Sequence, residues 1–181
     1  MLGSLFCALG KAFGACDKKE LEGVIHILQK NNAELQKQLP EPIIPVTDLV
    51  WITRTDYLVE LAKVGIKPID WGTPLDISLS LTSKAELDRI APFLVQPADE
   101  YIAEIRDCED YGIEAQSRAS KYRVSSVRLG LGNMPLGYHG FAVTMDKEFN
   151  IWWLEPNSGF EYAGVWYKIG DNGYSPDKVF V

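Results

Sequence analysis

Cysteine and histidine are scarce in this chain of 181 residues, which contains three cysteines and two histidines. The cysteines are Cys7, Cys16 and Cys108, an odd number with wide spacing. A disulfide framework needs an even set of cysteines, and a zinc site needs cysteine or histidine ligands at short spacing, so neither is expected. Sparse, unpaired cysteine is typical of proteins made in a reducing compartment, which favours the cytoplasm or a virion assembled there.

Basic residues are in the minority, with 18 lysines and arginines against 25 aspartates and glutamates. The net charge of −7 argues against a broad positive surface for phosphates, so we expect no nucleic-acid partner. The remaining composition, 46% hydrophobic and 24% charged residues, is typical of a globular protein.

Long hydrophobic runs are also missing, because no stretch reaches the roughly 18 consecutive apolar residues of a membrane span. Residues 1–17 are apolar and glycine-rich, but they lack a basic start, and Lys11 interrupts the apolar run. A secretion signal is therefore not supported. Leaving such a segment in water is costly, so we expect residues 1–17 to dock onto other proteins of a larger particle.

Residues 18–39 form the clearest predicted helix, and Pro40 and Pro42 follow it. Its apolar positions repeat as a heptad that includes one asparagine: Leu21, Ile25, Leu28, Asn32, Leu35 and Leu39. This pattern favours a short coiled coil and a homo-oligomer, because a buried asparagine penalises wrong registers. A plain amphipathic helix that packs on its own domain is the alternative, since Val24 and Ile27 widen the apolar face.

The prolines of residues 40–47 predict a stiff, extended linker. The predicted domain then spans residues 48–181. Its first half contains helices expected over residues 57–64, from Ser83 to about Pro92, and over residues 108–122. Four strand-like runs follow: "VSSVRLGLG", "HGFAVTMD", "NIWWLEP" and "VWYKIG". Helices first and strands later predict an α+β domain, with a central helix packed on an antiparallel sheet.

The segment "RDCEDYGIEA" places Cys108 among three carboxylates at the start of the central predicted helix. Asp107 is a good N-cap, and the helix dipole favours Glu109 and Asp110 in the first turn. A thiol at a helix N-terminus is close to backbone N–H groups that stabilise a thiolate. A buried structural cysteine would fit the same position.

His139 and Glu155 lie on consecutive predicted strands, in "GYHGFAVTM" and "NIWWLEPNSG". The two positions are symmetric about residue 147, inside the predicted turn "MDKEFN", so a hairpin would bring them side by side. A carboxylate can orient an imidazole, which in turn removes the proton of a nearby thiol. The sequence therefore predicts a site that contains Cys108, His139 and Glu155.

This order of cysteine, histidine and acid resembles the papain-like and transglutaminase-like cysteine peptidases. The motifs "DCEDYGIEA", "GYHGFAV" and "WWLEPNSG" are most similar to the C-terminal domain of the fairy-ring mushroom agglutinin and its phage-encoded, lectin-like relatives. The resemblance covers about residues 95–160, and glycine replaces the family's alanine at positions 112 and 140. It implies that Cys108 is the nucleophile, His139 the general base and Glu155 the orienting carboxylate of an enzyme for peptide substrates.

The resemblance also implies Ca²⁺, held by Asp107, Glu109 or Asp110. A bound cation would reverse the negative field that three carboxylates create around the thiol. The alternative is that these acids only satisfy the helix dipole.

The leading functional expectation is a papain-like peptidase module carried as an oligomeric component of a larger assembly, such as a phage virion. One alternative is a catalytically dormant structural connector, in a collar or tail, with the same fold. Another is a carbohydrate-binding module that stacks sugars on Trp152, Trp153 or Trp166, although alternating aromatic residues in strands usually belong to a core.

Overall fold

The computed structural model describes residues 43–69 and 76–181, which belong to one compact unit, Ile43–Val181. Residues 1–42 lie outside the described part, so the docking segment and the oligomerising helix remain predictions. Val46, in the predicted linker, is buried and its N–H donates to the carbonyl of Tyr122 at 3.0 Å. None of the described helices is both long enough and apolar enough to cross a membrane.

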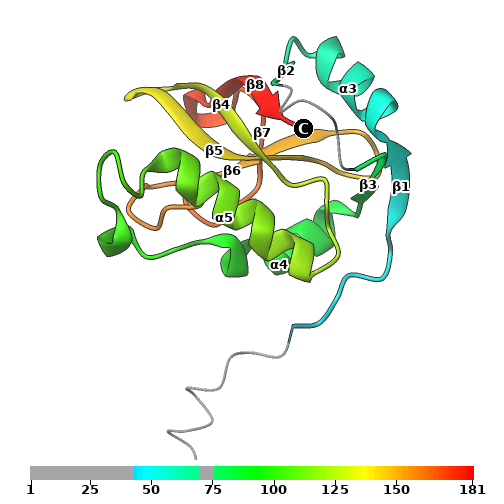
Figure 1. Ribbon diagram of the computed structural model, residues 1–181, viewed down its shortest axis with the longest axis horizontal. Helices are drawn as coiled ribbons and strands as arrows, with labels where there is room; N and C mark the ends of the chain where they lie inside the picture. Colours follow the sequence, from blue (N-terminus) through cyan, green and yellow to red (C-terminus); the bar gives the residue numbers. More distant parts are fainter. Residues whose placement is uncertain (1–42, 70–75) are drawn as a thin grey trace, which may run out of the picture. The chain divides into compact units, whose positions relative to one another are not determined.

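The strands of the described residues form two sheets (Figure 1). The larger has six strands in the order β2-β8-β4-β5-β6-β7. These strands are β2 Lys67–Ile69, β4 Arg128–Met134, β5 Gly137–Met145, β6 Ile151–Leu154, β7 Tyr167–Lys168 and β8 Ser175–Phe180. The smaller sheet pairs β1 (Val50–Thr53) with β3 (Ser78–Leu81) in antiparallel fashion.

The α+β class predicted from the sequence agrees with this architecture, but the prediction of an entirely antiparallel sheet is wrong at one edge. There β2 runs parallel to β8, while the other neighbours in the six-stranded sheet are antiparallel. The sequence pattern predicts neither of these two strands. β2 has only three residues and β8 contains Pro176, so neither has the apolar alternation that predicts a strand.

Side-chain caps explain where the three α-helices of the described residues begin. In α3 (Arg54–Lys63) the Thr53 hydroxyl accepts from the N–H of Asp56 at 3.1 Å, so the helix starts three residues earlier than predicted. The Ser83 hydroxyl caps α4 (Lys84–Leu94), as the sequence predicts. The third helix is α5 (Cys108–Lys121), preceded by the short 3₁₀ turn Ala98–Glu100.

The second helix, predicted to end near Pro92, continues two residues further, to Leu94. Proline within a helix removes one backbone hydrogen bond. The side chain of Leu94 is fully buried in the core, and this burial holds the last turn of the helix in place.

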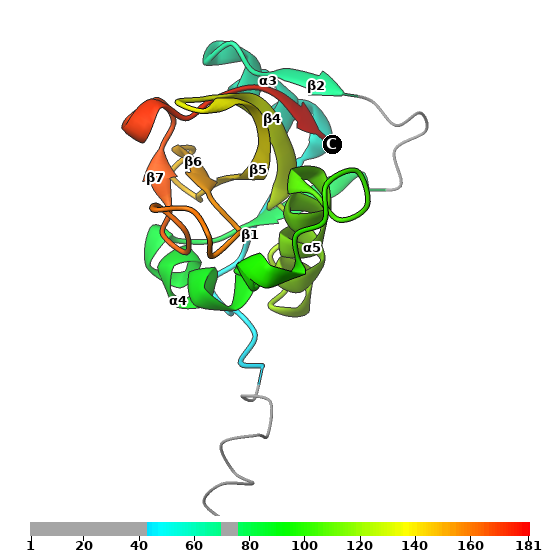
Figure 2. The same cartoon turned by 90° about the vertical axis from the view of Figure 1, so that its left-hand side faces the viewer.

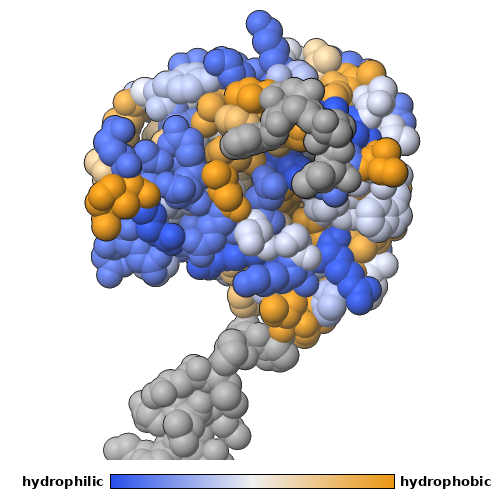
Figure 3. All heavy atoms as spheres, viewed as in Figure 1, coloured by the Kyte–Doolittle hydropathy of each residue, from blue (hydrophilic) through white to orange (hydrophobic). Residues whose placement is uncertain are grey.

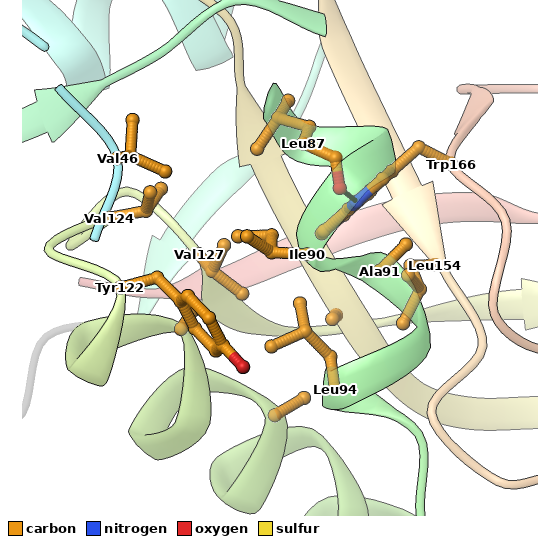
Figure 4. Close-up of a cluster of buried hydrophobic side chains, with 13 residues drawn as sticks. Val46, Leu87, Ile90, Ala91, Leu94, Tyr122, Val124, Val127, Leu154 and Trp166 are labelled. Carbon is orange, nitrogen blue, oxygen red and sulfur yellow. Dashed lines mark hydrogen bonds between the residues drawn. The ribbon is translucent and has the colours of Figure 1, made fainter. Parts of the chain in front are cut away.

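Helices α4 and α5 pack together on one side of the curved sheet, where α5 contacts β4 and β5 (Figure 2). A cluster of buried side chains fills the space between them, including Leu87, Ile90 and Leu94 (Figure 4). Trp166 enters this cluster, and its Nε1 donates to the carbonyl of Leu87 at 2.9 Å.

A second buried cluster covers the opposite face of β5, where Phe141, Val143 and Met145 alternate with residues that face α5. Trp153 is fully buried there, and Trp166 is 2% exposed in the first cluster, so these two tryptophans belong to the core. On the outside, the face seen in Figure 3 shows hydrophobic residues in small groups among hydrophilic ones.

Candidate active site

The candidate site forms where β5 extends beyond its neighbour β6. The two strands pair from Ala142 opposite Leu154 to Met145 opposite Ile151, so residues 137–141 of β5 continue past the end of β6. The first turn of α5 lies beside this extension. A Cβ placed on Gly140 would be 3.1 Å from backbone atoms of Cys108 and Glu109, which only glycine accommodates without displacement.

His139 and Glu155 meet at this extension, as the sequence predicts. The Nε2 atom of His139 is 2.8 Å from Oε2 of Glu155. His139 is 9% exposed and Glu155 is fully buried. Because Nε2 is hydrogen-bonded to the carboxylate, Nδ1 is the ring nitrogen left to exchange a proton with another group.

The two residues meet diagonally, and this differs from the predicted hairpin. Continuing the observed register places Glu155 level with Phe141, so the turn is centred on residue 148 and not on residue 147. The Asp146 carboxylate sets this turn by accepting from the N–H groups of Glu148 and Asn150. Diagonal neighbours on adjacent strands are still within reach of long side chains.

Both oxygens of the Glu155 carboxylate have further partners. Oε1 accepts from the backbone N–H of Asn157 at 3.0 Å, and Oε2 accepts from the hydroxyl of Tyr174 at 3.2 Å. Burial, followed by the nearby Glu155 carboxylate, raises the pKa of Tyr174, so this hydroxyl stays protonated as a donor. A buried carboxylate requires such partners because it has lost its contact with water.

Aromatic side chains surround the imidazole of His139. The ring centroid of Phe160 is 5.0 Å from that of His139, and Tyr174 lies edge-on at 6.4 Å. The sequence alone does not indicate a role for either residue. Both lie outside the motif-bearing strands, and aromatic residues in loops carry no pattern that indicates a contact with a distant histidine.

Cys108 is the first residue of α5 and a free, half-buried cysteine. Its thiol donates to Oε2 of Glu109 at 3.1 Å. Burial, the hydrogen bond to Glu109 and the charges of Glu109 and Asp107 raise its pKa to about 12, although the N–H of Gly140 acts in the opposite direction. In this arrangement the cysteine is a neutral thiol whose proton is directed to Glu109.

The three predicted metal ligands separate into two roles. Asp107, Cys108 and Glu109 offer ligand atoms within 4.8 Å of one another, whereas Asp110 accepts from the N–H of Asp107 and caps the helix. The pKa of Asp107 is raised first by its hydrogen bond with Glu109, and that of Glu109 is lowered first by the bond from Cys108. Two adjacent carboxylates fit a hard cation such as Ca²⁺, while the sulfur does not.

No family model matches the chain, and no curated protein matches its sequence. Two solved structures are similar to it in fold. One is the PSL1a–E64 complex, with a TM-score of 0.52 and 13% identity over 72% of this chain and 51% of that chain. The other is the Polyporus squamosus lectin bound to a human-type influenza-binding epitope, Neu5Acα2-6Galβ1-4GlcNAc. Its TM-score is 0.53 and its identity 13%, over 72% of this chain and 49% of the lectin chain.

The described domain shares the fold of about half of a lectin chain. This finding supports the part of the resemblance that pointed to a mushroom lectin. At 13% identity the similarity shows the fold alone, and the roles of Cys108, His139 and Glu155 remain predictions.

Proposed function

We propose that the domain is a papain-like cysteine peptidase-type module in which Cys108 is the nucleophile, His139 the general base and Glu155 the orienting carboxylate. The observation that carries this proposal is the buried contact of 2.8 Å between His139 and Glu155. His139 directly precedes Gly140, and the backbone of Gly140 packs against Cys108 at the start of α5.

In this proposal the imidazole removes the thiol proton at Nδ1, and the Cys108 sulfur attacks the carbonyl carbon of a peptide bond. The proton then passes from the imidazolium to the departing amine, which leaves a thioester on the sulfur. Water, deprotonated by the same imidazole, hydrolyses the thioester and releases the acid. The buried Glu155 carboxylate orients the ring and stabilises its cation throughout.

The proposal includes a Ca²⁺ site on Asp107 and Glu109. When bound, the ion supplies a positive charge beside the thiol and offsets the field of the two carboxylates. The Glu109 carboxylate accepts a hydrogen bond from the Cys108 thiol, so a carboxylate that bound the ion instead would release the thiol to react with His139.

Alkylation by E64, an epoxide that reacts with activated cysteine thiols, tests the proposal on the full chain. We use a Cys7→Ser/Cys16→Ser chain, in which Cys108 is the single thiol, and follow adduct formation by mass spectrometry in the presence of Ca²⁺. We expect one adduct, no adduct in the additional Cys108→Ala variant, and at least about a hundredfold slower reaction in His139→Ala. Equal rates with and without His139 would contradict the proposal.

A second candidate is a catalytically dormant structural module, carried as an oligomeric connector of a larger assembly such as a phage virion. The raised pKa of Cys108 and the direction of its thiol toward Glu109 favour this candidate. It predicts no E64 adduct with or without Ca²⁺, together with an oligomer of the full chain in light scattering. A monomer in solution would count against the assembly.

A third candidate is carbohydrate binding, which the shared fold with a lectin supports. Trp153 and Trp166 are buried, and the amino group of Lys84 lies 4.7 Å above the Trp152 ring. Sugar stacking therefore requires another aromatic residue, and Trp51, 66% exposed, is available. A glycan array of the full chain and of Trp51→Ala tests this candidate. A silent array would contradict it.

A further inference from the structure

Tyr174 lies at the end of a 3₁₀ turn, Asp171–Gly173, directly before β8, and it is 1% exposed. Its hydroxyl donates to Oε2 of Glu155 at 3.2 Å, the same oxygen that is 2.8 Å from Nε2 of His139. One carboxylate oxygen thus joins a tyrosine from the C-terminal part of the chain to the candidate catalytic histidine.

The tyrosine ring is held rigidly, so its hydroxyl has a defined position. The ring stacks on Trp153 with a centroid distance of 3.8 Å and an interplanar angle of 4°. Phe141 meets the ring edge-on at 5.4 Å, and Trp153 is itself anchored by a 2.9 Å hydrogen bond from Nε1 to the carbonyl of Lys168. The hydroxyl can therefore fix the carboxylate, because its own freedom is already removed.

We infer that Tyr174 is a positioning residue that holds the Glu155 carboxylate in the orientation that directs His139 toward Cys108; this inference rests on the proposed function. Asn157 N–H holds Oε1 and the Tyr174 hydroxyl holds Oε2, so the carboxylate cannot rotate away from the imidazole. Without the hydroxyl, Oε2 keeps only its bond to His139, and the carboxylate and ring turn together. A role in packing alone would require the aromatic ring and not its hydroxyl.

Tyr174→Phe separates these two roles because it keeps the ring. In the single-thiol chain we expect E64 alkylation of Cys108 to slow on the order of tenfold, as for other partners that orient a catalytic group. The matched control is Tyr162→Phe, a ring of the same cluster that lies edge-on to Tyr174 at 6.5 Å, and it should react at the parental rate. If Tyr174→Phe also reacts at the parental rate, the inference is overturned.

A double-mutant comparison tests whether Tyr174 acts through Glu155. Once Glu155→Gln has removed the carboxylate, adding Tyr174→Phe should change the alkylation rate less than twofold, because coupled residues are not additive. A full tenfold effect in that background would overturn the inference, because Tyr174 would then act by another route.

A spectroscopic measurement does not depend on the reactivity of Cys108. The chain has two histidines, His26 and His139, and a His26→Gln variant assigns their imidazole signals. We expect the Nε2 proton of His139 to appear downfield in slow exchange, with a nuclear Overhauser effect to Tyr174, and to exchange faster in Tyr174→Phe.

If the unmodified chain shows no nuclear Overhauser effect between His139 and Tyr174, the inference is overturned, even if Tyr174→Phe does not fold. An unreactive Cys108 combined with an intact His139 signal would instead overturn the proposed function.

Discussion

The backbone of Gly140 lies directly against the backbone of Cys108. A Cβ at Gly140 would be 3.1 Å from the carbonyl carbon and oxygen of Cys108, closer than side chains normally pack. This contact between β5 and α5 sets how near the thiol is to the strand that carries His139, and it gives the first of four predictions.

Replacing Gly140 with alanine should push the start of α5 away from β5 by a few tenths of an ångström. We expect a loss of about 1–3 kcal/mol in the free energy of unfolding, the usual cost of overpacking. E64 alkylation of Cys108 should also slow, because the sulfur would lie farther from the N–H of Gly140 and from the strand that carries His139. Urea denaturation measures the stability, and mass spectrometry of the adduct measures the alkylation rate. If neither changes, the start of α5 moves to accept the extra methyl group without cost.

Gly132→Ala should cost more than Gly140→Ala. Its Cβ would lie 2.1 Å from the carbonyl oxygen of Ser175 and 2.5 Å from Cα of Pro176, where the pairing of β4 and β8 changes register. These are backbone atoms, so no side-chain rotation relieves the clash, and we expect a loss of at least about 3 kcal/mol. Gly112→Ala is the control, because its closest contact, 2.5 Å, is the flexible end of Leu129. Equal losses in urea denaturation would contradict this reasoning.

Asp48 should make the stability depend on pH at the acid end. Burial alone would raise its pKa, but hydrogen bonds from Thr82, the N–H of Ser83 and Lys147 lower it from 3.8 to about 2. Because the folded pKa is the lower one, the contribution is present above about pH 4 and disappears as the pH falls through 2. Allowing for solvent screening, Asp48→Asn should cost about 1 kcal/mol at pH 7 and almost nothing at pH 2. A cost independent of pH would show that the carboxylate charge is irrelevant.

Calcium should accelerate E64 alkylation of Cys108 on the order of tenfold, and a chelator should reverse the effect, because the ion offsets the carboxylate field at the thiol. The response should vanish in Asp107→Asn/Glu109→Gln and persist in Asp110→Asn, whose side chain can still cap α5. Rates are compared with and without Ca²⁺ within each variant. An equal response in the double variant would place the ion elsewhere.

The start of α5 and the pairing of His139 with Glu155 could be predicted because both depend on local patterns. Asp107 and Asp110 form a capping arrangement around Cys108, and apolar strands on either side of a polar turn define a hairpin. The predicted turn centre is one residue away from the observed one, which displaces the predicted strand register by two residues. The error arose because the Asp146 side chain, and not the strand pattern, decides where the turn is centred.

The thiol environment could not be predicted from the helix start alone. A helix N-terminus favours a thiolate, but the structure directs the thiol to Glu109 and buries it, and these effects outweigh the N–H of Gly140. Rotamers and burial decide this balance, and neither is encoded in the spacing of residues.

The amino-acid sequence by itself determined the local elements: where helices are capped, which strands alternate, and which side chains could do chemistry. Only the tertiary structure decided that Tyr174 meets Glu155 and that Gly140 meets Cys108. Such contacts join residues far apart in the chain. They depend on the order of strands in the sheet and on where one strand extends beyond the end of its neighbour. Short-range propensities cannot specify that geometry, because it results from packing both faces of the sheet at once.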